Sequence, residues 1–76
     1  MDLKESRVRL TRAESRERTR AHLLEAAADV FAQRGFHGAS VEEVADVAGY
    51  TKGAVYSNFA SKDELLRETL EYRTRR

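Results

Sequence analysis

The chain has 76 residues, 36% of them charged, with a formal net charge of +1, no cysteine and no proline. A chain of this length forms one small domain, and without cysteine it has neither a disulfide framework nor a cysteine-ligated zinc site. No apolar run approaches the roughly 20 residues that span a membrane, and the start lacks the apolar region of a signal peptide, so a soluble cytoplasmic protein is expected.

The first ten residues, 1–10, alternate charges with single aliphatic side chains and show no helical period. They predict a flexible basic arm. Its Arg7 and Arg9, with Arg12 just beyond, are suited to follow phosphates or to enter a minor groove. A disordered solubilising tail fits the same residues.

A long helix is predicted to begin between residues 11 and 15 and to end near Arg34. Thr11 and Glu14 have the spacing of a capping box at its start. The side chains expected on its inner face are Leu24, Ala27, Ala28 and Phe31, with Leu23 and Val30 beside them.

Gly35 stands where a Schellman-type stop needs a left-handed residue, and Phe36 is then placed to fold back on Phe31. His37 and Gly38 are expected to continue this loop up to Ser40.

Residues 40–59 predict two short helices joined by a glycine turn. Ser40 and Glu43 match a capping box, and Gly49 follows the first helix as its left-handed stop. The apolar stripe of that helix consists of Val41, Val44, Ala45 and Ala48. Thr51 is suited to cap the second helix, in which Val55 and Phe59 share a face. Two short helices with this turn form a helix-turn-helix unit, whose second helix can enter a DNA major groove.

A last helix is predicted after Ser61, which forms a further capping box with Glu64. Its inner face is expected to consist of Leu65, Leu66, Thr69 and Leu70. The helical propensity continues to the last residue without a stop signal, so we expect this helix to be the start of a longer one.

Three residues are unfavourable for the helices in which they are predicted to lie: Lys52, Lys62 and Gly53. Each lysine follows a cap directly, where the helix dipole disfavours a cation by roughly 0.3–1 kcal/mol. Gly53 costs a helix about 1 kcal/mol relative to alanine. A phosphate backbone lying against these helix starts accounts for all three, because the lysines neutralise it and glycine lets it approach. The alternative is that the lysines are neutral surface residues and that Gly53 serves packing between helices.

The end of the second short helix carries Tyr56, Ser57 and Asn58, types of side chain that commonly bond phosphate oxygens. Base reading is expected from Lys52, Ala54 and Ser57, since the Ala54 methyl group can touch a thymine methyl. A half-buried core position is the alternative for Tyr56.

These residues resemble the DNA-binding domain of the TetR family of bacterial transcriptional repressors, from about Arg18 to Glu68. The marks of the resemblance are LLEAAADVFAQRGFHGAS, the turn residues Ala45, Ala48 and Gly49, the stretch TKGAVYSNF, and SKDEL. The resemblance implies an all-α fold, in which residues 11–76 form a three-helix DNA-binding head of homeodomain-like type with the start of a fourth helix. It also implies a homodimer bound to a roughly palindromic operator in double-stranded DNA.

By position, the resemblance assigns Ser40 to a phosphate and Thr51, Lys52, Gly53 and Ala54 to the groove. It assigns Tyr56, Asn58 and Lys62 to the DNA backbone and Ser57 to the neighbourhood of base edges. Two positions depart from the family pattern: Tyr50 replaces a small aliphatic residue in the turn, and Asn58 stands where many members have histidine.

Family members continue into a helical domain that binds a small-molecule inducer and forms the dimer, and that domain is expected to be absent from this chain. Regulation by a ligand is therefore implied for a longer parent protein, most simply a repressor released by its ligand.

Other function classes fit the sequence less well. His22 and His37 are fifteen residues apart, and the acidic residues near them do not complete a metal site. The sequence also contains neither a nucleophile turn nor a glycine-rich phosphate loop. We therefore expect no enzyme activity, no cofactor and no metal. A helical protein-interaction module and another class of helix-turn-helix protein remain as alternatives. Salt-dependent binding to duplex DNA distinguishes the interaction module from a DNA-binding head.

Overall fold

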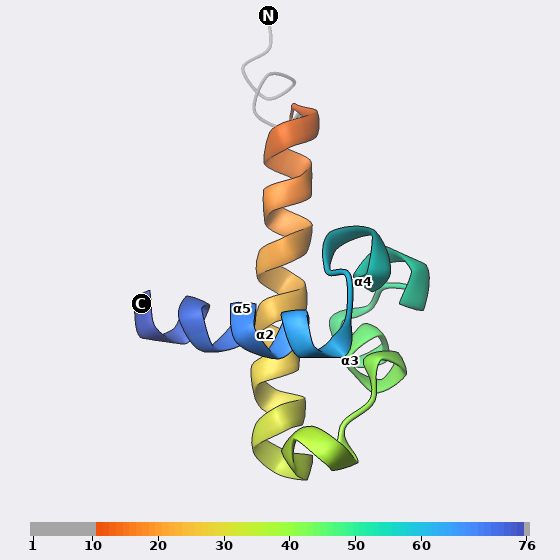
Figure 1. Cartoon of the computed structure of the whole chain (residues 1–76). Coiled ribbons are helices and arrows are strands. Elements are labelled where there is room, and N and C mark those ends of the chain that lie inside the picture. Colours follow the sequence, from red (N-terminus) through yellow and green to blue (C-terminus); the bar gives the residue numbers. More distant parts are fainter. Residues whose placement is uncertain (1–10, 76) are drawn as a thin grey trace, which may run out of the picture.

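The structure is a computed structural model that describes residues 11–75, and every regular element in this range is a helix. In chain order the helices are α2 (Arg12–Gly38), α3 (Val41–Ala48), α4 (Lys52–Asn58) and α5 (Lys62–Arg75). In Figure 1, α3 and α4 lie together beside α2, and α5 crosses α2. The prediction of an all-α helix-turn-helix head followed by a further helix is confirmed. The predicted arm, residues 1–10, lies outside the described residues.

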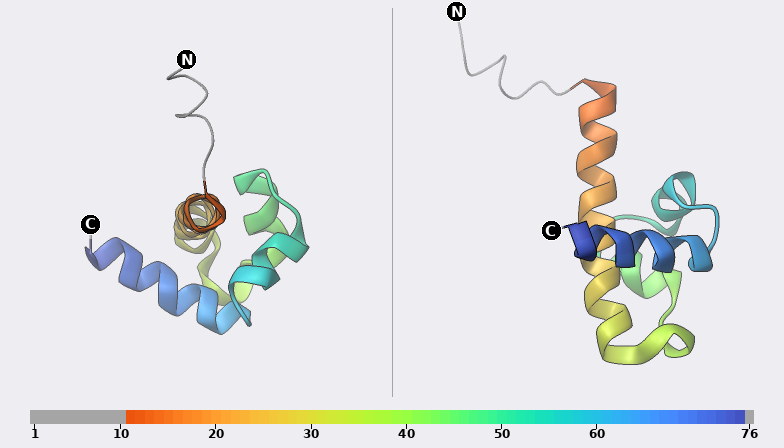
Figure 2. Two further views of the ribbon diagram at one scale, coloured as in Figure 1. Left: turned by 90° about the horizontal axis from the view of Figure 1, so that it is seen from above. Right: turned by 60° about the vertical axis from the view of Figure 1, so that its left-hand side comes forward.

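Helix α2 begins at the earlier of the two predicted starts. The Thr11 hydroxyl accepts a hydrogen bond from the Glu14 backbone N–H at 3.0 Å, and the Thr11 N–H donates to the Glu14 carboxylate at 3.0 Å. This complete capping box satisfies two backbone N–H groups that the start of a helix otherwise leaves unpaired. Residues 11–18 are all exposed, and the right-hand view in Figure 2 shows this end of α2 projecting from the body.

The buried face of α2 is centred on Leu23, Ala27 and Val30, which have the i, i+4, i+7 spacing of one helix face. The predicted face was centred one residue further along the helix. Phe31 does pack against the core, although it is only partly buried, whereas Ala28 is partly buried and is not part of the core. Both α3 and α5 pack against α2. The packing directions of these partners select the buried side chains, and the apolar pattern of α2 alone does not contain that information.

Gly35 interrupts α2 as predicted, but by a different geometry. Its φ of 76° and ψ of 167° lie in a region that is essentially restricted to glycine, whereas a Schellman stop needs a left-handed helical ψ. Residues 36–38 then form a helical turn instead of the predicted loop, and the Ala39 N–H donates to the Gly35 carbonyl at 3.0 Å. The Phe36 ring does return to Phe31, with 6.1 Å between ring centroids.

Helix α3 starts and stops where predicted. The Ser40 hydroxyl accepts from the Glu43 N–H at 3.0 Å, and Gly49 ends the helix in the left-handed conformation, with φ 83° and ψ 27°. The second half of the predicted capping box is replaced, because the Glu43 carboxylate instead accepts a 2.6 Å bond from Arg34. A charged guanidinium is a stronger donor than a backbone N–H, which accounts for the exchange.

Tyr50, the departure in the turn, connects the turn to α2. Its hydroxyl lies 2.8 Å from Nδ1 of His22, and its ring packs on the edge of the core. The larger side chain therefore adds a contact to the turn.

Helix α5 packs on α2 through Leu65 and Thr69, which are both buried. The Thr69 hydroxyl donates to the Leu65 carbonyl at 2.7 Å, so its burial leaves no donor unsatisfied. The prediction that Leu70 is on the inner face was wrong, since its side chain is 57% exposed. No helix within residues 11–75 is long and apolar enough to cross a bilayer.

Candidate nucleic-acid interface

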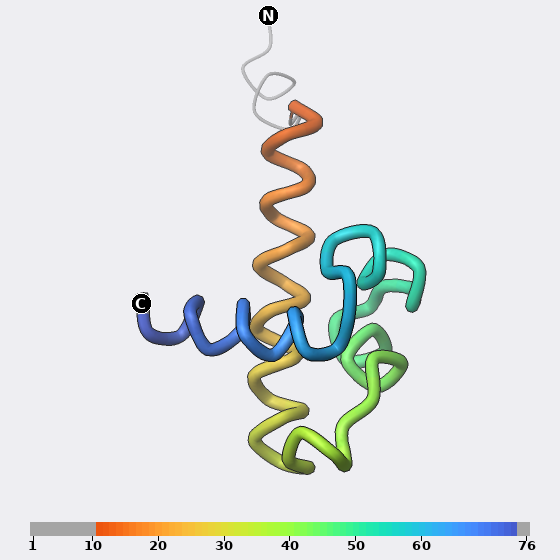
Figure 3. The backbone as a smooth tube through the Cα atoms, in the orientation of Figure 1, coloured from red at the N-terminus to blue at the C-terminus, as the bar shows by residue number. Residues whose placement is uncertain are grey.

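The starts of α3, α4 and α5 meet around one surface depression of about 350 Å³. The polar and charged residues that border it are Ser40, Glu42, Lys52, Tyr56 and Lys62. Figure 3 shows the backbone passing through α3, the turn and α4 as one compact unit beside α2. Residues that the sequence assigned to one function thus come from three helices to one place.

The exposed start of α4 carries three of the predicted groove residues, Thr51, Lys52 and Gly53. The Thr51 hydroxyl accepts from the Ala54 N–H at 3.1 Å and caps the helix as predicted, while Ala54 itself is half-buried. Val55 and Phe59 anchor the opposite face of α4 in the core. This anchoring fixes which side of the short helix is presented to the outside.

Gly53 is exposed at the start of α4. A Cβ added at this position would meet nothing closer than the Thr51 hydroxyl oxygen, at 3.8 Å, which is an ordinary contact distance. The interpretation of Gly53 as a residue required for helix–helix packing is therefore wrong. The backbone at the start of α4 is therefore accessible from outside at this position.

Lys52 and Lys62 border the same depression but have different partners. The Lys52 ammonium is 3.1 Å from the Glu42 carboxylate, and both side chains are largely exposed. The Lys62 ammonium lies 4.6 Å from the centroid of the Phe36 ring, a cation–π distance that holds the charge beside the start of α3.

Of the polar side chains in the last turn of α4, one extends into solvent and two form hydrogen bonds with the backbone of the same helix. Tyr56 is 48% exposed and is not among the residues that form or pack against the core, so the alternative of a core position is wrong. The Ser57 hydroxyl donates to the Ala54 carbonyl at 3.1 Å, and the Asn58 amide donates to the same carbonyl at 2.9 Å. Asn58 is half-buried, and a second N–H of its amide remains for an outside acceptor.

Sequence reasoning missed Arg20, which joins three helices. Its guanidinium donates to the Asn58 carbonyl at the end of α4, at 3.0 Å, and pairs with Glu68 of α5 at 3.2 Å. The guanidinium carbon also lies 4.6 Å from the centroid of the Phe59 ring. The available signal was spacing, because Arg20 precedes Leu24 by four residues and so lies on the apolar side of α2.

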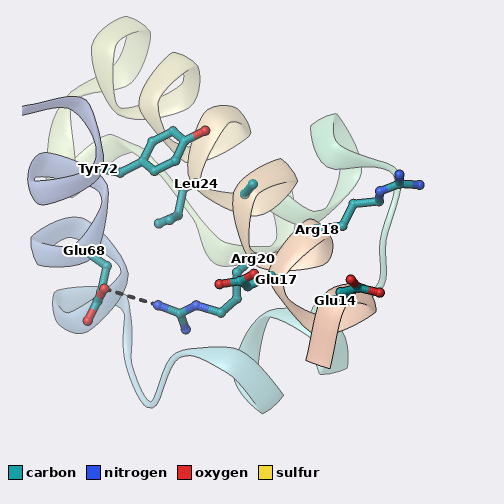
Figure 4. A pocket seen from close by; sticks show the side chains of 8 residues that line it. Glu14, Glu17, Arg18, Arg20, Leu24, Glu68 and Tyr72 are labelled. Atoms are coloured by element: carbon teal, nitrogen blue, oxygen red, sulfur yellow. Dashed lines mark hydrogen bonds and ion pairs between the residues drawn. The ribbon is translucent and has the colours of Figure 1, made fainter. Parts of the chain in front are cut away.

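A second hollow, of about 680 Å³, lies between α2 and α5 and is separate from the depression. Figure 4 shows its charged lining, with Arg20 reaching across to Glu68. Glu14, Glu17 and Arg18 also line it, so its charges are mixed. Within residues 11–75 no three histidine or acidic side chains gather in a way that could hold a metal ion.

The amino-acid sequence is similar to those of known proteins. Residues 23–69 match the family described as "Bacterial regulatory proteins, tetR family". The chain is 45% identical over 56 residues to the transcriptional activator FasR of Mycolicibacterium smegmatis. The matched stretch covers 74% of this chain and 26% of FasR. The chain is 47% identical over 51 residues to the transcriptional repressor KstR2 of Mycobacterium tuberculosis, covering 67% of this chain and 26% of KstR2.

A third relative, the transcriptional regulator AcrR of Shigella flexneri, is 41% identical over 63 residues, which cover 83% of this chain and 29% of AcrR. The chain thus spans only about a quarter of the length of these curated relatives. No solved structure matches it significantly.

Proposed function

Because the chain belongs to the TetR family of bacterial regulatory proteins and corresponds to the DNA-binding domain of that family, we propose that the α3–α4 unit binds double-stranded DNA with sequence specificity. Helix α4 enters the major groove and presents Thr51, Lys52, Gly53 and Ala54, with Ser57 near base edges. Phosphates on either side are bound by Ser40, Tyr56, Asn58 and Lys62.

One observation carries the proposal: Ser40, Lys52, Tyr56 and Lys62 border a single depression although they come from three helices. A protein that docks a helix in the major groove contacts the backbone with elements on both sides of that helix. Hydroxyl and ammonium groups gathered at this place match the chemistry of phosphate oxygens. The exposed position of Gly53, which has no side chain, supports a close approach of DNA to the start of α4.

For a longer parent protein we propose a cytoplasmic homodimer bound to a palindromic operator. Two such heads would then bind half-sites about one helical turn, roughly 34 Å, apart or a multiple of it. The relatives are named both activator and repressor. We propose a repressor that a small molecule releases through a further domain, with the basic arm, residues 1–10, adding phosphate contacts.

The test uses a fluorescently labelled duplex of mixed sequence and the chain of residues 1–76. Anisotropy should report binding that weakens steeply as salt rises, because phosphate contacts release condensed counterions. Selection from a pool of randomised duplexes should then enrich one short motif. Absence of binding at low salt would favour the protein-interaction module, and binding without enrichment would remove sequence specificity from the proposal.

A further inference from the structure

Glu42 places a negative charge within the surface proposed to receive DNA. We propose that Glu42 holds Lys52 away from DNA in the free protein and thereby limits the affinity of the head for duplex DNA. This inference rests on the proposed function and adds to it a residue that opposes binding.

The local contacts separate Glu42 from its neighbour Glu43. Both lie in the first turn of α3, but Glu43 is bonded to Arg34, which does not border the depression. Glu42 does border it, and its carboxylate is 3.1 Å from the Lys52 ammonium. Glu43 is therefore neutralised by Arg34, which lies outside the depression. Glu42 is instead neutralised by Lys52, a residue that is proposed to bind DNA.

The exposure of the Lys52–Glu42 ion pair determines how strongly the two side chains are held together. The side chains of Lys52 and Glu42 are 54% and 70% exposed, so the pair is weak and opens readily. While the ion pair between Lys52 and Glu42 is intact, the two charges cancel, and Lys52 releases no counterion from DNA. When Lys52 turns to a phosphate or a base, the Glu42 carboxylate is left unpaired beside a polyanion. Each of these effects lowers affinity, and replacing the carboxylate with an amide removes both.

The experiment compares Glu42→Gln with Asp46→Asn on the labelled mixed-sequence duplex. Asp46 is the matched control because it is an exposed acidic residue of the same helix, does not border the depression and is not bonded to Lys52. Glu42→Gln should bind about two- to tenfold more tightly than the parent chain. Its plot of log affinity against log salt should be steeper by about 0.9, the value for one phosphate contact. Asp46→Asn should change both quantities less.

A double-mutant cycle with Lys52→Ala tests the pair itself. In the Lys52→Ala background, Glu42→Gln should produce a smaller gain than in the parent chain. An equal gain in both backgrounds, an equal gain from Asp46→Asn, or no gain at all would overturn the inference. Urea unfolding of each variant identifies any change that stems from stability. If the parent chain itself binds no duplex, the proposed function fails as well, whereas normal binding with an unresponsive Glu42 refutes this inference alone.

Discussion

Lys62 lies at the first position of α5, where the helix dipole disfavours its charge, and the Phe36 ring holds its ammonium beside the depression. A phosphate contact at this position carries no sequence information. We therefore expect Lys62→Ala to weaken binding to all duplexes by a similar factor and to flatten the salt slope by about 0.9.

Anisotropy titrations on several unrelated duplexes, each at several salt concentrations, check this prediction. Arg67→Ala provides the control, because it removes a cation from an exposed position of the same helix that does not border the depression. A loss restricted to one duplex sequence would contradict a phosphate role for Lys62.

Single residues were predictable from sequence where their neighbours along the chain determine their position. Tyr56 follows Val55, which is buried, so its exposure could be inferred from the helical period. Leu70 was misplaced because its position depends on where α5 crosses α2. Lys52 was predicted to face DNA, but its ion pair with Glu42 joins two helices and was not anticipated.

At the scale of elements, Gly53 allows folding and binding to be separated. A Cβ at position 53 fits without a clash, so Gly53→Ala should stabilise α4 and raise the free energy of unfolding by about 0.5–1 kcal/mol. The same methyl group should weaken duplex binding, because the DNA backbone is proposed to approach this position closely. Urea unfolding followed by circular dichroism and anisotropy titration measure the two effects.

Gly38→Ala is the matched control. A Cβ there would meet the Arg34 Cβ at an ordinary 3.5 Å, and Gly38 does not border the depression. This variant should bind duplex as the parent chain does. If Gly53→Ala also bound as the parent chain does, close approach of DNA at Gly53 would be ruled out.

The starts and stops of helices were largely predictable because caps are local signals. Thr11, Ser40 and Thr51 each accept the expected backbone hydrogen bond. The return half of the capping box failed at Ser61, where the Glu64 carboxylate accepts from the Ala60 N–H instead of the Ser61 N–H. Small shifts in backbone direction decide which N–H a flexible glutamate reaches, and the residue pattern does not specify them.

At the scale of the whole molecule, Arg20 joins α2 to the end of α4 and to α5. Its positive charge lies at the carbonyl end of α4, where the helix dipole favours a cation. We expect Arg20→Ala to lower the free energy of unfolding by about 1–3 kcal/mol, since it removes a charged donor from a part-buried carbonyl and from Glu68.

Urea unfolding measures this loss, with Arg18→Ala as the control from an exposed position of the same helix. Arg20→Lys keeps the charge but cannot reproduce the two-way guanidinium contact, so its stability should lie between those of Arg20→Ala and the parent chain. Equal stability of Arg18→Ala and Arg20→Ala would exclude the bridging role.

The predicted order of helices was confirmed, whereas the contacts that orient them were not predictable. Arg20 and Glu68 are 48 positions apart, and nothing in the local pattern around either residue identifies the other. His22 and Tyr50 form a similar link between α2 and the turn. Such pairs depend on the packing of distant segments, which one sequence without its relatives does not reveal.

The proposed function requires that the starts of α3, α4 and α5 form one DNA-binding surface. The most direct test is a nitrogen–proton NMR titration of the 15N-labelled chain with the mixed-sequence duplex. We expect the largest changes in amide chemical shift at Ser40, at residues 51–58 and at Lys62, while the outer face of α2 and the last turns of α5 should change little. Changes concentrated in the hollow between α2 and α5, or spread evenly over the chain, would contradict the proposed function.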